Sequence, residues 1–219
     1  MNFKQAHVSN FTRGRINPIE YIVIHYTAND GDTAKNNADY FANNANLSSS
    51  ANYFVDEITE WQSVKDNDTA YHCGAKTYKH KACRNHNSIG IELCSRRDAN
   101  GNYYFKDETI KRAAALTKEL MKKYNIPIEN VIRHYDVTGK ICPAPMVNNE
   151  KLWKEFLSML SENPKLETGN DIVWELMNGE YKIEITEVAK AVKALDMAKT
   201  SPEFHSLYWI LYKLVNNNR

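Results

Sequence analysis

Residues 21–27 read YIVIHYT, and this stretch decides the fold expected for the first part of the chain. It opens with aromatic and β-branched residues, which predict a short buried strand. Residues 88–94, SIGIELC, and 130–134, NVIRH, predict two further strands, and apolar residues recur at helical spacing through 107–124 between them. Strands that alternate with helices indicate an α/β fold with a central mixed β-sheet flanked by helices.

Shorter elements are expected around these strands. The sequence predicts helices at 33–47 and 152–160 and neighbouring strands at 52–56 and 60–64. Asp32 or Thr33 is placed to cap the first of these helices. Residues 76–87 are polar and basic, which predicts a loop.

The composition changes near residue 163 and divides the chain. Residues 161–171, SENPKLETGND, combine Pro, Gly and Asn with charged residues, which is typical of a linker. We therefore expect one domain at 1–163, a linker at 164–170 and a small all-α C-terminal module at 171–219. The length of 219 residues fits this division, since a domain takes about 150 residues. A module this small lies near the limit of independent stability, so docking or self-association is expected to support it.

Charge and hydropathy exclude two classes of function. The chain has 28 Lys and Arg residues against 27 Asp and Glu residues, a net charge of +1, which argues against a dedicated nucleic-acid binder. No apolar run approaches the roughly 20 residues that span a bilayer, so no membrane insertion is expected. Residues 1–15 contain no apolar segment of the kind found in a secretory signal. We expect a chain that is made in the cytoplasm without a signal peptide.

Two histidines and one cysteine are candidate metal ligands. His25 lies at the end of the first predicted strand, and His134 lies at the end of the strand at 130–134. Cys142 follows eight residues after His134 through a turn that contains Gly139. Two His and one Cys can hold zinc and leave a fourth position for water, as in catalytic sites. A structural role for each residue is the alternative at this point.

Glu92 and Lys140 are the candidates for acid–base and electrostatic roles. Glu92 is the one carboxylate in an apolar strand, and near a zinc-bound water such a group can accept and return a proton. The alternative is an edge strand with Glu92 facing solvent. Lys140 lies two residues before Cys142, where an ammonium can stabilise an oxyanion. Its alternative is an ordinary surface lysine.

Together these residues resemble the type 2 family of zinc-dependent N-acetylmuramoyl-L-alanine amidases. This family includes phage endolysins, autolysins, muropeptide-recycling amidases and peptidoglycan recognition proteins. The resemblance covers residues 21–145 and is carried by the segments 22–27 (IVIHYT), 50–56 (SANYFVD), 87–93 (NSIGIEL) and 133–143 (RHYDVTGKICP).

The resemblance assigns a role to each candidate. It implies that His25, His134 and Cys142 bind Zn²⁺, that Glu92 is the general base and that Lys140 polarises the scissile carbonyl. The reaction implied is metal-assisted amide hydrolysis.

The same resemblance suggests substrate contacts. Residues 71–74, YHCG, resemble a family segment beside the substrate cleft, which implies that His72 contacts substrate or groups behind the ligands. Some members have a tyrosine where this chain has Ala51, and many have a histidine where it has Asn52. Asn52 and the nearby Tyr53 are therefore candidates for substrate contacts that differ from those of other members.

The function implied is cleavage of the bond between N-acetylmuramic acid and L-alanine in bacterial peptidoglycan. We expect a phage endolysin that lyses its host after release through holin pores, with the module at 171–219 binding a wall polymer or mediating self-association. A cytosolic muropeptide-recycling amidase and a non-catalytic peptidoglycan-recognition module are the alternatives.

Three cysteines, Cys73, Cys83 and Cys94, have no role in this reaction. In a reducing compartment we expect them to be free thiols. Two alternatives stay open, namely a Cys73–Cys83 disulfide formed after export and a second zinc site that combines these two cysteines with His72, His80 and His86.

Overall fold

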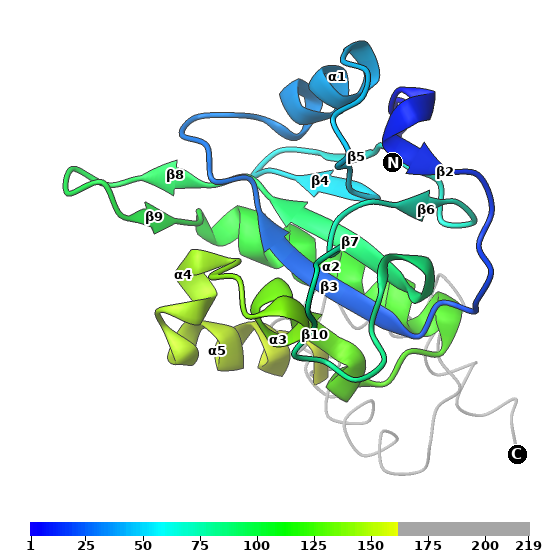
Figure 1. The fold of residues 1–219 in the computed structure, drawn as a ribbon. Helices are drawn as coiled ribbons and strands as arrows, with labels where there is room; N and C mark the ends of the chain where they lie inside the picture. The colour runs from blue at the N-terminus through cyan, green and yellow to red at the C-terminus, as the bar shows by residue number, and fades with distance from the viewer. Residues whose placement is uncertain (162–219) are drawn as a thin grey trace, which may run out of the picture. The chain divides into compact units, whose positions relative to one another are not determined.

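A computed structural model describes residues 1–161 (Figure 1). Its centre is a six-stranded mixed sheet with the order β1-β5-β4-β7-β3-β10. In that order the strands are Asn2–Phe3, Glu60–Gln62, Tyr53–Val55, Ser88–Leu93, Tyr21–Tyr26 and Val131–Arg133. Within the sheet only β4 and β5 pair antiparallel. The expected α/β fold with a central mixed sheet is confirmed.

Strands β3, β7 and β10 run parallel, and their register brings their carboxyl ends to one edge of the sheet. His25 of β3 pairs with Glu92 of β7. Ile24 of β3 pairs with Arg133, the last residue of β10, so the next residue, His134, arrives beside His25. Polar side chains from three separate segments of the chain therefore meet at the edge where α/β folds place their functional groups.

The two faces of this sheet differ because side chains alternate along each strand. One face of β3 and β7 packs against helix α2, Asp107–Tyr124, which runs behind the sheet in Figure 1. The buried residues of this core include Ile22, Ile24, Ile89, Ile91, Ile110, Leu116 and Leu120. The opposite face carries the alternate residues of β7, which are Ser88, Gly90 and Glu92.

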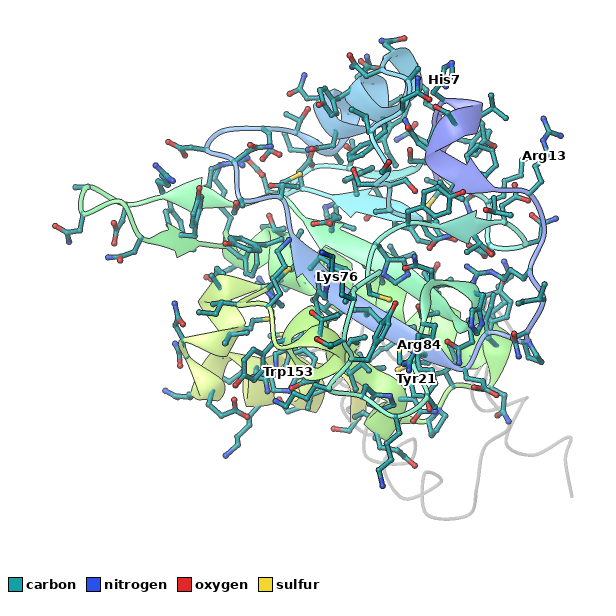
Figure 2. All side chains as sticks on the ribbon, in the orientation of Figure 1. His7, Arg13, Tyr21, Lys76, Arg84 and Trp153 are labelled. Carbon is teal, nitrogen blue, oxygen red and sulfur yellow. The ribbon has the colours of Figure 1, made fainter. Side chains whose placement is uncertain are left out.

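The other helices pack against strands or against one another. Helix α1, Ala34–Asn43, contacts β4 and β5, and Thr33 caps it by a hydrogen bond from the Asn36 amide to the Thr33 hydroxyl. Helices α3, His134–Thr138, and α4, Ala144–Val147, follow β10. Helix α5, Glu150–Ser161, packs against α2 and buries Trp153 (Figure 2).

Short elements complete the described part of the chain. Strands β2 and β6 form one two-stranded pair, and β8 and β9 form another that projects from the sheet in Figure 1. These strands are Phe11–Thr12, Thr69–Ala70, Arg96–Arg97 and Tyr103–Tyr104. The 3-10 helices are Val8–Asn10, Asn85–Asn87 and Ile128–Asn130.

The structure confirms the main predicted elements and shifts some of their ends. The first helix ends at Asn43 rather than at residue 47, and His134 begins a helix rather than ending a strand. The expected linker at 164–170 and the module at 171–219 lie outside the described residues. Within residues 1–161, no helix is both long and apolar enough to cross a membrane.

Candidate metal centre and active site

The candidate ligands His25, His134 and Cys142 lie together at the carboxyl edge of the sheet. Their donor atoms all lie within 4.8 Å of one another, and all three residues are buried. The sulfur of Cys142 is 3.7 Å from Nδ1 of His25. The pairing of β3 with β10 places the two histidines, and the chain after α3 returns the cysteine to them.

A tight turn brings Cys142 back to the histidines. Gly139 ends α3 in the left-handed conformation, at φ 84°, and its amide donates to the carbonyl of Tyr135. A left-handed backbone favours glycine because a Cβ is crowded there. The Tyr135 amide then donates to the carbonyl of Cys142 at 2.9 Å, which closes the loop. The Gly-containing turn expected between His134 and Cys142 is therefore present.

The donor chemistry of this cluster fits a zinc ion. Burial lowers the pKa of His25 well below its ordinary value and that of His134 to about 4, so both rings are neutral and have a lone pair to offer. Burial, and then the Glu92 carboxylate, raise the pKa of the Cys142 thiol to about 12. A bound dication reverses that preference by stabilising the thiolate. Imidazole nitrogen and thiolate sulfur are both zinc ligands, and three of them leave the fourth tetrahedral position open.

Glu92 lies next to the three ligands on the same face of the sheet. Its Oε1 is 3.9 Å from Nδ1 of His25, and its buried Oε2 has no hydrogen-bond partner within residues 1–161. Burial raises the pKa of Glu92 to about 8, and the positive charge of Lys140 opposes this shift. Strand β7 lies between β3 and β4, so the alternative of an edge strand is wrong. A dication bound beside it would favour the ionised form again, and the Oε2 of that carboxylate is available for water or substrate.

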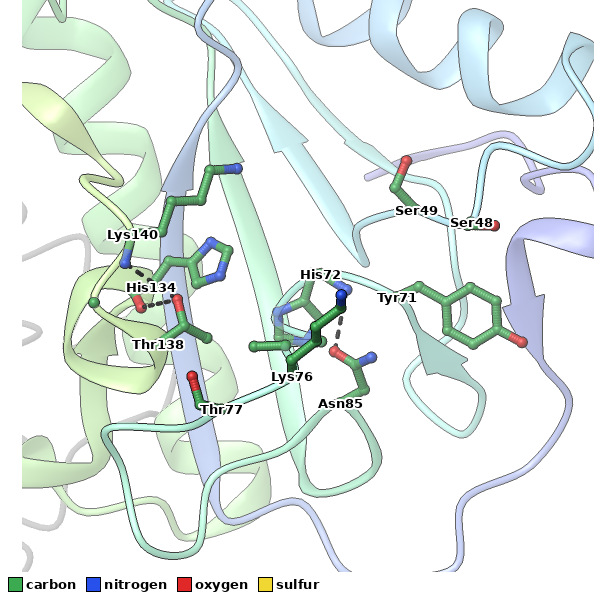
Figure 3. A pocket seen from close by; sticks show the side chains of 13 residues that line it. Ser48, Ser49, Tyr71, His72, Lys76, Thr77, Asn85, His134, Thr138 and Lys140 are labelled. Carbon is green, nitrogen blue, oxygen red and sulfur yellow. Dashed lines mark hydrogen bonds between the residues drawn. The ribbon is translucent and has the colours of Figure 1, made fainter.

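A polar cleft of about 740 Å³ opens beside the cluster and is lined by His134 and Lys140 among others. Figure 3 shows His72 between Lys140 on one side of this cleft and Tyr71 on the other. Lys140 is exposed, and its backbone amide donates to the hydroxyl of Thr138 at 3.3 Å. After burial, its ammonium is a further cause of the lowered pKa of both His25 and His134, the two candidate ligands.

The three candidates for substrate contacts are all buried. His72 lines the cleft, and its Nδ1 is 3.0 Å from Nε2 of His25. Asn52 accepts a hydrogen bond from the Gly90 amide at 3.0 Å, and Tyr53 donates to Asp66 at 2.5 Å. Neither Asn52 nor Tyr53 is among the residues found to line the cleft in the described part of the chain. The role of Asn52 and Tyr53 as substrate contacts stays a prediction. Their location away from the lining of the cleft does not favour that role.

The other cysteines are buried free thiols in the described part of the chain. Cys73 and Cys83 pack with Val23 and Val137 on the face of the sheet opposite α2. Within residues 1–161, His25, His134 and Cys142 are the only group of three or more His, Cys, Asp or Glu side chains close enough to hold a metal. Within residues 1–161, Cys73 and Cys83 are therefore free thiols, and no second cluster of candidate metal ligands is found.

Two residues near the ligands had no predicted role, although the sequence carries a signal for them. Ser88 and Gly90 alternate with apolar residues along β7 and so share a face with Glu92. The strand sequence SIGIEL shows this alternation. The role of the two small residues depends on which loop crosses that face of β7, and the strand sequence alone does not predict the loop.

Comparison with known proteins agrees with this geometry. The family described as N-acetylmuramoyl-L-alanine amidase matches residues 15–145. The chain belongs to this amidase family. It is 36% identical over 159 residues to the N-acetylmuramoyl-L-alanine amidase CwlL of Bacillus licheniformis, an overlap of 68% of this chain and 43% of CwlL. The chain thus spans less than half the length of that relative.

Solved structures share the fold of this amidase family member. The structure of PlyL aligns with a TM-score of 0.61 at 28% identity and covers 73% of this chain and 96% of PlyL. A mutant endolysin from Bacillus subtilis aligns with a TM-score of 0.59 at 29% identity, over 73% of this chain and 97% of the endolysin. Both overlaps take in nearly the whole of the solved chain.

Proposed function

We propose that this chain is a zinc-dependent amidase that hydrolyses the bond between N-acetylmuramic acid and L-alanine in peptidoglycan. The observation that carries the proposal is the convergence of His25, His134 and Cys142 beside Glu92, in a chain of the N-acetylmuramoyl-L-alanine amidase family. A non-catalytic recognition module would not need the complete set of ligands together with a carboxylate.

Each residue of the cluster has a separate task in this proposal. His25, His134 and Cys142 hold zinc, which supplies a Lewis acid and lowers the pKa of water towards about 7. Glu92 accepts a proton from the attacking water as the water oxygen bonds to the lactyl carbonyl carbon. Lys140 stabilises the negative charge that develops on the carbonyl oxygen.

The second half of the reaction returns that proton. As the carbon–nitrogen bond breaks, Glu92 passes its proton to the departing amine of L-alanine. The products are a lactyl carboxylate and a free α-amino group, and Glu92 ends as a carboxylate. Oε2 of Glu92 has no hydrogen-bond partner among residues 1–161, which supports this role, because an oxygen already engaged in a structural hydrogen bond is less available for a proton.

We further propose that the protein is a phage endolysin that acts on the cell wall of its host after release through holin pores. The likeness to an endolysin from Bacillus subtilis supports this role. The segment 171–219 would then bind a wall polymer or mediate self-association.

Digestion of purified peptidoglycan, with and without a chelator, tests the proposal. We expect new free amino groups on L-alanine, no new reducing sugar ends, loss of activity with chelator and recovery with zinc. New reducing ends, or activity that persists without metal, would contradict the amidase assignment. Cleavage of soluble muropeptides but not of intact sacculi would instead indicate a recycling amidase.

A further inference from the structure

A buried chain of hydrogen bonds connects the ligand His25 to the protein backbone. Nε2 of His25 lies 3.0 Å from Nδ1 of His72, and Nε2 of His72 lies 3.1 Å from the hydroxyl of Ser88. The Ser88 hydroxyl donates at 2.6 Å to the carbonyl of Arg84. His25, His72 and Ser88 are all buried, so little competing water reaches this chain.

The last acceptor sets the direction of every hydrogen bond in the chain. A backbone carbonyl only accepts, so the Ser88 hydroxyl donates its proton to the Arg84 carbonyl. The same hydroxyl therefore accepts a hydrogen bond from Nε2 of His72. A neutral imidazole has one N–H, so Nδ1 of His72 is left as an acceptor for the N–H at Nε2 of His25. The lone pair of His25 is then on Nδ1, the nitrogen that lies 3.7 Å from the sulfur of Cys142.

Gly90 gives the His72 ring the space that this chain requires. A Cβ at position 90 would lie 2.6 Å from Cγ and 2.9 Å from Nδ1 of His72, closer than real contacts allow. Gly90 lies between Ser88 and Glu92 on the same face of β7, which is the face on which the ring rests. The glycine is therefore required here for the close approach of a ring, not for an unusual backbone angle.

We propose that His72, held by Ser88 and seated against Gly90, is a positioning residue that fixes His25 in the tautomer whose Nδ1 binds the metal. This inference rests on the proposed metal site. Histidine ligands generally donate their second N–H to an outer partner that sets the tautomer and the ring orientation. Here that partner is His72, whose own tautomer is set by its hydrogen bond to Ser88.

The same geometry separates this role from a substrate contact. Both ring nitrogens of His72 are engaged, one by His25 and one by Ser88. No ring nitrogen is left to bind substrate, although the residue lines the cleft. Loss of His72 should therefore weaken metal binding, whereas loss of a substrate contact would raise KM and leave metal affinity unchanged.

The tautomer can be measured directly in the metal-free wild-type chain by nitrogen-15 NMR of the histidine rings. We expect the ring proton of His25 on Nε2 and that of His72 also on Nε2. A proton on Nδ1 of His25 would overturn the inference. This experiment requires neither a variant nor bound zinc, so it stands even if the proposed metal site fails.

Zinc affinity of the full chain, measured by competition with a chromophoric chelator, tests the consequence. His72→Leu removes the acceptor and should weaken zinc binding about 10- to 100-fold, as for other outer partners of metal ligands. His72→Gln keeps an acceptor oxygen and should recover part of that loss. Gly90→Ala should also weaken zinc binding, because the added Cβ displaces the His72 ring. This variant keeps every hydrogen-bonding group of the chain.

A matched serine pair supplies the control. Ser88→Ala should weaken zinc binding, whereas Ser63→Ala should not, since Ser63 is equally buried but its hydroxyl has no hydrogen-bond partner within residues 1–161. Wild-type affinity in His72→Leu and Gly90→Ala would overturn the inference. If the wild-type chain binds no zinc, the proposed metal site fails, and the NMR result still decides the direction of the hydrogen bonds.

Discussion

His25 and Glu92 occupy paired positions on the parallel strands β3 and β7, and 3.9 Å separates Nδ1 of the histidine from Oε1 of the glutamate. The pairing places a proposed metal ligand and a proposed general base on one face of the sheet. The rigid centre of the sheet therefore sets their separation, which a loop could not hold as closely.

Loss of the sulfur ligand should remove metal and activity together. Cys142→Ser replaces a thiolate, which zinc binds well, with a hydroxyl that is a poor ligand at neutral pH. We expect zinc content after dialysis to fall from about one ion per chain to a small fraction, with activity falling in proportion. Atomic absorption on the purified variant measures the zinc. The matched control is Cys94→Ser, at a buried thiol outside the cluster; equal zinc loss in both variants would contradict the assignment of Cys142.

Lys140 should contribute to catalysis without holding metal. It is exposed, so Lys140→Ala should leave the fold and the zinc content unchanged. We expect kcat to fall about 100-fold, the lower end of the loss seen when an oxyanion-stabilising group is removed. Lys76 also lines the cleft and is the matched control, for which Lys76→Ala should change KM more than kcat. A Lys140→Ala variant with wild-type kcat would remove Lys140 from the reaction.

Stability should depend on pH through Glu57, which is neither a candidate metal ligand nor one of the described residues that line the cleft. Burial opposes ionisation of Glu57, but hydrogen bonds from Lys106 and Arg96 outweigh it and lower the pKa of Glu57 to about 2, below its ordinary value of 4.5. Because the folded pKa is the lower one, the stabilisation is complete above about pH 4.5 and is lost as the pH falls towards 2.

Thermal unfolding of Glu57→Gln across this range checks the prediction. At pH 6 the Tm of the variant should be lower than that of the wild-type chain. The difference between the two Tm values should decrease steadily as the pH approaches 3. Glu108→Gln is the control, because its ion pair with Lys111 is 61% exposed on both sides and should contribute little at any pH. A Tm difference between Glu57→Gln and the wild-type chain that does not change with pH would contradict the role of Glu57.

Much of the site could be predicted because it lies at the ends of strands. The β-branched runs before His25 and His134 identify two strands, and parallel pairing brings their ends together. Glu92 is conspicuous as a carboxylate in an apolar strand. The five two-residue strands gave no signal, since a period of two cannot be seen in two residues.

The orientation of neighbouring side chains could not be predicted in the same way. Tyr53 faces the core shared with α2 and donates to Asp66, and which face it takes depends on the register of β4. The role inferred for His72 depends on a loop that crosses β7 directly over Gly90. Contacts between residues so distant in sequence follow from tertiary packing and not from local pattern.

The most direct test of the central claim compares Glu92→Gln with the wild-type chain at equal, measured zinc content on purified peptidoglycan. Glutamine keeps the size of the side chain but cannot accept a proton, so we expect zinc affinity to be retained and the release of L-alanine amino groups to fall about 100- to 10,000-fold. Near-normal release by the zinc-loaded variant would contradict the account, because Glu92 would then have no part in the hydrolysis.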